Sequence, residues 1–259
     1  MTAIEYFQSI IMLHKTLSHS FEYSPKVDLF FKCGKEVALI NMAFNLAIYA
    51  NDRIKQHNYI TALFTSLVHS IRAGLGSAEF KRKEYDLDNK SSRNFHSAVN
   101  YVKCLFARNS RLLVLRIDFS YLQNYTKNIG LKAAKTDFTN FLNNVRGNKK
   151  LSSELEGYIW KIESGPLKGI HFHCLFFYGV TTTCHAEYWA TQLGMCWRKT
   201  TENHGEYANK NASTTDFDER GYHGVGIISR HDKDQEKRDV LLNLIVRYLV
   251  SVDQYLMGV

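Results

Sequence analysis

The sequence predicts an α+β protein in which a helical N-terminal region precedes an antiparallel sheet of about five strands with flanking helices. Three observations support this class. Apolar residues recur at three-and-four spacing through the first hundred residues, as they do in amphipathic helices. Short runs of branched residues, typical of strands, begin only at Leu112. From there the pattern is β, α, β, β, α, β, α, which is typical of helices that cover the faces of one sheet.

The first half of the chain is expected to be helical. The predicted helices are residues 4–17, 37–54, 60–71 and 95–108. Residues 81–93 are polar and dense in charge, which favours an exposed loop or an internal boundary. We therefore expect a helical region of unknown role over residues 1–108 and the sheet domain over residues 109–259.

The second half contains the strands. The predicted strands are residues 112–118, 157–163, 170–178 and 223–229, and the predicted helices are residues 128–146, 186–199 and 234–256. Residues 164–169 contain two glycines and a proline, so the two strands that they connect should form an antiparallel hairpin. Residues 200–221 are polar and show no regular pattern.

Composition limits the class of protein and its partners. Of 259 residues, 45% are hydrophobic and 22% are charged, and the net charge of +8 favours a polyanionic partner such as nucleic acid. The longest apolar stretch, residues 37–50, is too short to span a membrane. The five cysteines and the absence of a basic N-terminal region argue against a secreted protein. We expect a soluble cytoplasmic protein with no membrane partner.

Two histidines mark the candidate metal site. His171 and His173 are two residues apart in a predicted strand, so both imidazoles lie on one face while Phe172 and Cys174 face the other. The preceding strand ends in Glu163, which the hairpin would bring beside them. Two imidazoles and a carboxylate suit Mg²⁺ or, given the nitrogen ligands, Mn²⁺. The alternative is a pair of half-buried, hydrogen-bonded histidines.

Tyr248 is the candidate nucleophile. It lies in an otherwise apolar part of the last predicted helix. A core tyrosine whose hydroxyl has a hydrogen-bond partner is the ordinary explanation. The functional alternative is that the phenol attacks a phosphodiester held on the metal ion and forms a 5′-phosphotyrosine.

The order of these motifs resembles that of the HUH endonuclease superfamily, the nickases of rolling-circle replication and plasmid mobilisation. More closely, three segments resemble the filamentous-phage (inovirus) replication-initiator-like family of phages and prophages. They are Trp160-Lys-Ile-Glu163, His171-Phe-His-Cys-Leu-Phe-Phe177 and Tyr248-Leu-Val-Ser-Val-Asp-Gln254. The resemblance covers about residues 112–256. It implies an HUH-type or RRM-like sheet domain over this part of the chain.

The resemblance also implies roles for individual residues. Glu163, His171 and His173 would hold the divalent metal, and Tyr248 would be the nicking tyrosine. Arg116 and Asp118 occupy the family's first strand motif and would lie near the bound single strand.

One departure from the family concerns phosphate charge. The family carries a lysine three residues after the tyrosine, where this chain has Ser251. Arg247 points about 100° away from Tyr248 on a helix and is a poor substitute. Lys161 or Arg116 is expected to supply the charge from the sheet.

Another residue of the last helix is a candidate second tyrosine. Tyr255 lies seven residues after Tyr248, and therefore on nearly the same helix face. Pairs of catalytic tyrosines in this superfamily are usually spaced more closely.

The leading hypothesis is therefore a site-specific DNA nickase that initiates rolling-circle replication of a phage or mobile element. Its expected partners are single-stranded or hairpin origin DNA and the host helicase and polymerase, since the chain has no P-loop. Ser251 motivates the alternative of a non-cleaving relative that binds origin or hairpin DNA as a regulator. A third hypothesis is an RNA-binding α+β module, because sheets of this kind also stack RNA bases.

Overall fold

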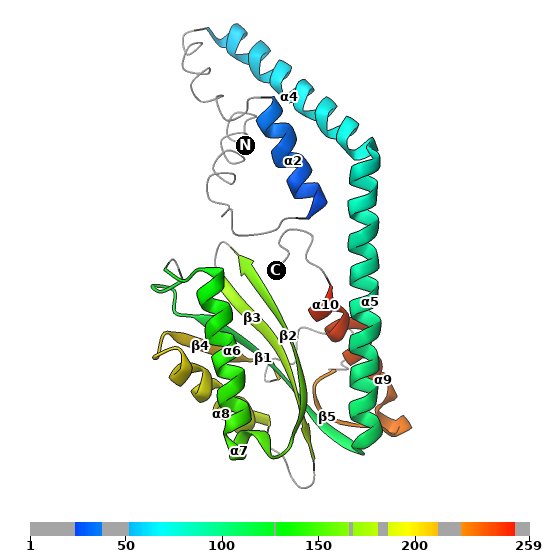
Figure 1. The fold of residues 1–259 in the computed structure, drawn as a ribbon, viewed down its shortest axis with the longest axis vertical. Coiled ribbons are helices and arrows are strands. Elements are labelled where there is room, and N and C mark those ends of the chain that lie inside the picture. The colour runs from blue at the N-terminus through cyan, green and yellow to red at the C-terminus, as the bar shows by residue number, and fades with distance from the viewer. Residues whose placement is uncertain are drawn as a thin grey trace. The chain divides into compact units, whose positions relative to one another are not determined.

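The computed structural model describes residues 24–37, 52–126, 128–165, 168–180, 186–211 and 224–251 (Figure 1). The chain divides into two compact units, Met1–Lys90 with Val252–Val259, and Ser91–Ser251. The predicted helix at residues 4–17, and most of the one at residues 37–54, lie outside the described residues. Within the described part of the chain, no helix combines the length and apolar character that crossing a bilayer requires.

The first unit is helical, as the sequence predicts. It contains α2 (Pro25–Glu36) and α4 (Arg53–Gly76), and the Asp52 side chain caps α4 by accepting a hydrogen bond from the Lys55 amide at 3.0 Å. Cys33, Ile60 and Leu67 form its buried apolar cluster. The predicted helix at residues 60–71 is confirmed as the middle of α4.

The prediction of an exposed loop at residues 81–93 is wrong. This segment lies inside α5 (Ala78–Arg108), a continuous helix of 31 residues, and the boundary between the two units falls within it. The dense charge is arranged at helical spacing, because Lys83 pairs with Glu79 at 2.9 Å and Arg82 with Asp86 at 3.9 Å. The segment also lacks glycine and proline. High charge density here marks a solvated helix surface.

The second unit is built on a five-stranded antiparallel sheet of order β2-β3-β1-β4, with β5 also paired to β1 (Figure 1). The strands are β1 (Arg111–Tyr121), β2 (Leu155–Gly165), β3 (Gly169–Gly179), β4 (Gly205–Asn209) and β5 (Gly226–Ser229). The predicted hairpin is confirmed as β2–β3, with Glu163 directly opposite His171. The α+β class and the central sheet are therefore as predicted.

One face of the sheet is covered by α6 (Leu131–Gly147) and α8 (Ala186–Thr200), and the short α7 (Lys149–Ser152) lies at the C-terminal end of α6 (Figure 1). Alternate residues of β1 and β3, including Phe119 and Phe172, point into this aromatic core. Phe172 stacks on Phe138 of α6 with ring centroids 4.2 Å apart. Phe172 and Cys174 thus face away from the two histidines, as the strand periodicity predicts.

The short strand β4 was not predicted, because its sequence lies in the polar stretch 200–221. Contacts with distant parts of the chain hold β4 in its extended conformation. Residues from Gly205 to Asn209 pair with the second half of β1, and the Trp197 indole of α8 donates a hydrogen bond to the Ser120 carbonyl of β1 at 3.0 Å. A Cβ on Gly205 would lie 2.4 Å from that indole nitrogen, so glycine allows the close approach.

The C-terminal helical segment is shorter and less regular than the predicted helix at residues 234–256. It consists of α9 (Gln235–Val240), a π-helical turn (Leu241–Val246) and α10 (Arg247–Val250). The backbone leaves the helix at Ser251, whose ψ of 135° is extended. The widened turn ends at Val246, two residues before Tyr248, and such π-type turns are frequent at functional sites.

Candidate metal and tyrosine site

The second face of the sheet has an apolar end and a polar end. At the apolar end, Leu112 and Val114 of β1 and Leu175 and Phe177 of β3 pack against α5 and the C-terminal helical segment. The next residues on the same face, two and four positions further along each strand, are Arg116 and Asp118 of β1 and His173 and His171 of β3. This alternation places the predicted site residues at the end of the apolar cluster.

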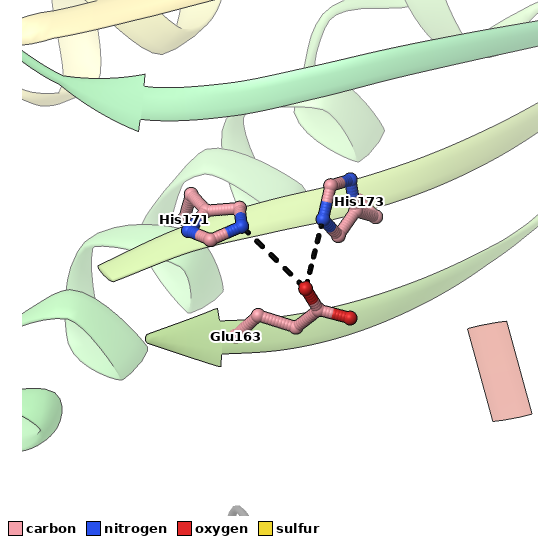
Figure 2. A group of neighbouring side chains, drawn as sticks. All are labelled: Glu163, His171 and His173. Atoms are coloured by element: carbon pink, nitrogen blue, oxygen red, sulfur yellow. Dashed lines mark hydrogen bonds and ion pairs between the residues drawn. The ribbon is translucent and has the colours of Figure 1, made fainter. Parts of the chain in front are cut away.

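Glu163, His171 and His173 form a compact cluster (Figure 2). The Nε2 atoms of His173 and His171 lie 3.2 Å and 3.6 Å from the same carboxylate oxygen, Glu163 Oε2. The hairpin register brings these residues together, because Glu163 is opposite His171 and Lys161 is opposite His173. The structure therefore juxtaposes the three residues that the sequence proposed as metal ligands.

The outer nitrogen of each imidazole is held by a hydrogen-bond acceptor. His173 Nδ1 donates to Asp118 Oδ1 at 2.7 Å, and His171 Nδ1 donates to the Gly169 carbonyl at 3.0 Å. These acceptors keep a hydrogen on Nδ1, so each Nε2, which donates to Glu163 when the ring is protonated, can instead present its lone pair to a metal ion. The arrangement orients both rings so that each Nε2 is available to a metal ion.

The electrostatics of the cluster favour a positive charge. Burial opposes ionisation of Glu163, but hydrogen bonds from His171 and His173, and then from a lysine and a tyrosine, hold its pKa well below the usual range. Burial also disfavours the imidazolium form of His173, yet hydrogen bonds to Asp118 and Glu163 raise the pKa of His173 to about 8. The carboxylates around these rings thus stabilise a cation.

The donor set fits a divalent metal ion. With bonds of about 2.1 Å, neighbouring ligand atoms lie about 3.0 Å apart around an octahedral ion and about 3.4 Å apart around a tetrahedral one. The two nitrogen–oxygen distances of 3.2 Å and 3.6 Å are close to these values. Two imidazoles and one carboxylate leave coordination positions for water or a phosphate oxygen, and the nitrogen ligands favour Mn²⁺ over Mg²⁺.

Tyr248 and Lys161 lie at the other oxygen of the same carboxylate. The Tyr248 hydroxyl donates a hydrogen bond to Glu163 Oε1 at 2.8 Å, and Lys161 Nζ lies 2.9 Å from that oxygen. The ammonium also lies 4.7 Å from the centroid of the Tyr248 ring. Tyr248 as a residue is 38% exposed.

The remaining predicted residues differ in their relation to the cluster. The Arg116 guanidinium lies 5.8 Å from the Tyr248 ring, whereas the Arg247 guanidinium packs on the Phe95 ring at 4.1 Å. The Ser251 hydroxyl donates to the Tyr248 carbonyl at 2.8 Å. Tyr255, the candidate second tyrosine, lies outside the described residues.

Two features of the site were not expected from the sequence. Asp118, predicted to lie near DNA, is the hydrogen-bond partner of His173, and Lys210 Nζ lies 3.9 Å from its second oxygen. The pairing of β1 with β3 sets Asp118 opposite His173, and Lys210 follows the unpredicted strand β4. The strand order, which the sequence does not show, would have been needed to find either contact.

Asp118→Asn tests the support of the histidine. An amide still accepts the hydrogen bond, but it lacks the charge that makes the ring a stronger ligand, so we expect Mn²⁺ affinity to fall by about 10–100-fold. Isothermal titration with Mn²⁺ measures the change. Asp137→Asn is the matched control, because Asp137 accepts a hydrogen bond from Tyr121 away from the cluster. Equal affinities for the two variants would contradict this role of Asp118.

Comparison with known proteins identifies a family for most of the chain. Residues 77–254 match the family described as the YagK/YfjJ C-terminal domain, which is found in prophage-like proteins. The match begins one residue before α5 and includes all five strands, the Glu163, His171 and His173 cluster, and Tyr248. No curated protein and no solved structure gives a significant match. The chain belongs to the YagK/YfjJ C-terminal domain family.

Proposed function

We propose that the protein is a metal-dependent, site-specific single-strand DNA endonuclease that forms a 5′-phosphotyrosine through Tyr248. Such an enzyme would initiate rolling-circle replication of a phage or related mobile element. One observation carries the proposal. The Tyr248 hydroxyl contacts one oxygen of the Glu163 carboxylate, Oε1, and the Nε2 atoms of both histidines contact the other, Oε2. A candidate nucleophile and three candidate metal-ligand groups therefore meet at one end of the sheet face. The occurrence of the family in prophage-like proteins supports a role in a mobile element.

The protein residues have separate tasks in this reaction. Glu163, His171 and His173 would hold a divalent ion, which when bound would polarise the scissile phosphate. Glu163 Oε1 orients the Tyr248 hydroxyl. Water takes up the phenol proton as the Tyr248 oxygen attacks phosphorus. The Tyr248 oxygen–phosphorus bond forms as the bond from phosphorus to the 3′ oxygen breaks, and the 3′ oxygen takes up a proton.

Lys161 of strand β2 places a positive charge beside Tyr248, which is the task of the helix lysine that Ser251 replaces in this chain. Its side chain is only 8% exposed, and its ammonium contacts both the carboxylate and the tyrosine ring. A positive charge here stabilises the developing phenolate and the phosphate charge next to it. We therefore assign to strand β2 the charge that Ser251 does not provide.

Lys161→Met keeps the length of the side chain and removes its charge. We expect strand cleavage to slow by about 10–100-fold, in the range of a lost electrostatic contact to a transition state. Adding Ser251→Lys to this variant should restore part of the rate, because position 251 lies three residues after Tyr248. Single-turnover cleavage of a labelled oligonucleotide measures both effects. Unchanged cleavage in Lys161→Met would contradict the assignment.

The direct test of the proposed reaction uses two end-labelled single strands with Mn²⁺. A 3′-labelled strand should become attached to the protein and migrate with it in a denaturing gel, because the 5′-phosphate fragment is the one retained. The same strand labelled at its 5′ end should give a shorter free product. Origin-region strands from the mobile element that carries the chain supply the sequences. If no such strand is cleaved or attached, the proposed activity is wrong.

A non-cleaving DNA-binding regulator is the second candidate. The observation that favours it is Ser251 at the family's lysine position, with its hydroxyl bonded to a backbone carbonyl. This candidate predicts tight origin binding that is unaffected by EDTA and by His171→Ala, with no covalent product. Competition between DNA and RNA strands of one sequence distinguishes either candidate from an RNA-binding module.

A further inference from the structure

A polar pocket of about 450 Å³ lies beside the metal-ligand cluster. It lies along the β4 edge of the sheet, where Asp118 and Ala208 of the cluster's face and Tyr207 and Arg198 of the opposite face line it. Its wall also includes His171 of the cluster. Glu163 of the cluster lies on β2, and Tyr248 bonds to it on that side of the sheet face. The pocket therefore begins where the cluster ends, on the side away from the tyrosine.

Three cationic side chains from separate elements line this pocket, together with two carboxylates, those of Asp118 and Glu206. Lys168 lies in the turn between β2 and β3, Arg198 in α8 and Lys210 directly after β4. The Arg198 guanidinium lies 5.6 Å from the ring of Tyr207, which also lines the pocket. Cationic groups beside an aromatic ring are the combination that binds the phosphates and bases of an unpaired strand.

The volume indicates how much of a strand the pocket can hold. Ligand pockets span about 300–1,000 Å³, so this one is large enough for about one nucleotide. A strand whose scissile phosphate lies at the cluster must leave it in two directions. The direction away from Tyr248 passes His171 into the pocket.

We infer that the pocket binds the unpaired nucleotide next to the scissile phosphate, with Lys168, Arg198 and Lys210 around its phosphate. This inference rests on the proposed single-strand endonuclease, since it takes the cluster as the place of the scissile phosphate. It assigns DNA contacts to three residues that the sequence motifs do not include.

Neighbouring residues of α8 provide the test. Arg198→Gln and Lys199→Gln remove one charge each from exposed adjacent positions, but only Arg198 lines this pocket. The probe is a fluorescein-labelled, 20-nucleotide single strand of random sequence, with EDTA present so that binding is measured without cleavage. We expect Arg198→Gln to weaken binding at least about threefold and to lower the slope of log affinity against log salt by about 0.7, as one lost phosphate contact does. Lys199→Gln should leave the affinity and slope close to those of the unmodified protein.

Lys168→Gln, in the hairpin turn, repeats the measurement at an independent position, and circular dichroism checks that each variant folds. The inference is overturned if neither Arg198→Gln nor Lys168→Gln differs from Lys199→Gln. That result would leave the nickase proposal intact, provided that the labelled strands still become attached to the unmodified protein. The reverse result, weaker binding in both pocket variants without strand cleavage by the unmodified protein, supports the pocket as a single-strand site and contradicts the nickase.

Discussion

Tyr248→Phe should abolish attachment of DNA to the protein and reduce strand cleavage by at least about a thousandfold. The substitution removes only the hydroxyl that lies 2.8 Å from Glu163 Oε1, and with it the atom that would bond to phosphorus. The ring keeps its contacts with Lys161 and His173. A 3′-labelled strand and a denaturing gel measure the attached product directly.

Tyr188→Phe is a closely matched control for this experiment. Tyr188 of α8 is 39% exposed against 38% for Tyr248, and a lysine ammonium, Lys150 Nζ, lies 5.3 Å from its ring centroid. It should cleave and attach DNA like the unmodified protein. An attached product that persists in Tyr248→Phe would show that another residue is the nucleophile, and Tyr255→Phe would then be the next variant to examine.

The local patterns of the sequence predict much of the site, because its main contacts follow from one hairpin. Period-two alternation puts His171 and His173 on one face, and the glycine-rich turn brings Glu163 opposite His171. These features depend on residues close together in the chain. For the same reason the helices with regular apolar spacing, such as α6 and α8, are found where they are predicted.

Contacts between distant segments explain what the sequence does not predict. Asp118 reaches His173 only because β1 pairs with β3, across 55 residues of sequence. Strand β4 forms because β1 and the Trp197 side chain hold a short polar segment in place. The charged segment at residues 81–93 has the composition of a loop, yet its ion pairs and lack of glycine and proline allow α5 to continue through it.

The metal hypothesis makes the second large prediction. His171→Ala should lower Mn²⁺ affinity by at least about a hundredfold, because it removes one of three protein ligands, and it should reduce cleavage to the level seen with EDTA. The fold should tolerate the change, since the ring makes its outer hydrogen bond only to the nearby Gly169 carbonyl. Isothermal titration with Mn²⁺ measures the affinity, and single-turnover cleavage measures the activity.

His204→Ala is the control for His171→Ala, because it removes a histidine that is not a proposed metal ligand. Its Nδ1 also bonds to a nearby carbonyl, that of Thr201, but its ring stacks on Tyr125 away from Glu163. This variant should bind Mn²⁺ and cleave DNA normally. If both histidine variants retain Mn²⁺ affinity, the cluster is a hydrogen-bonded pair of histidines and not a metal site. If instead only His171→Ala loses both the metal and strand cleavage while its single-strand binding in EDTA is unchanged, the cluster serves the chemical step. The regulator hypothesis then fails, because a non-cleaving protein has no cleavage to lose.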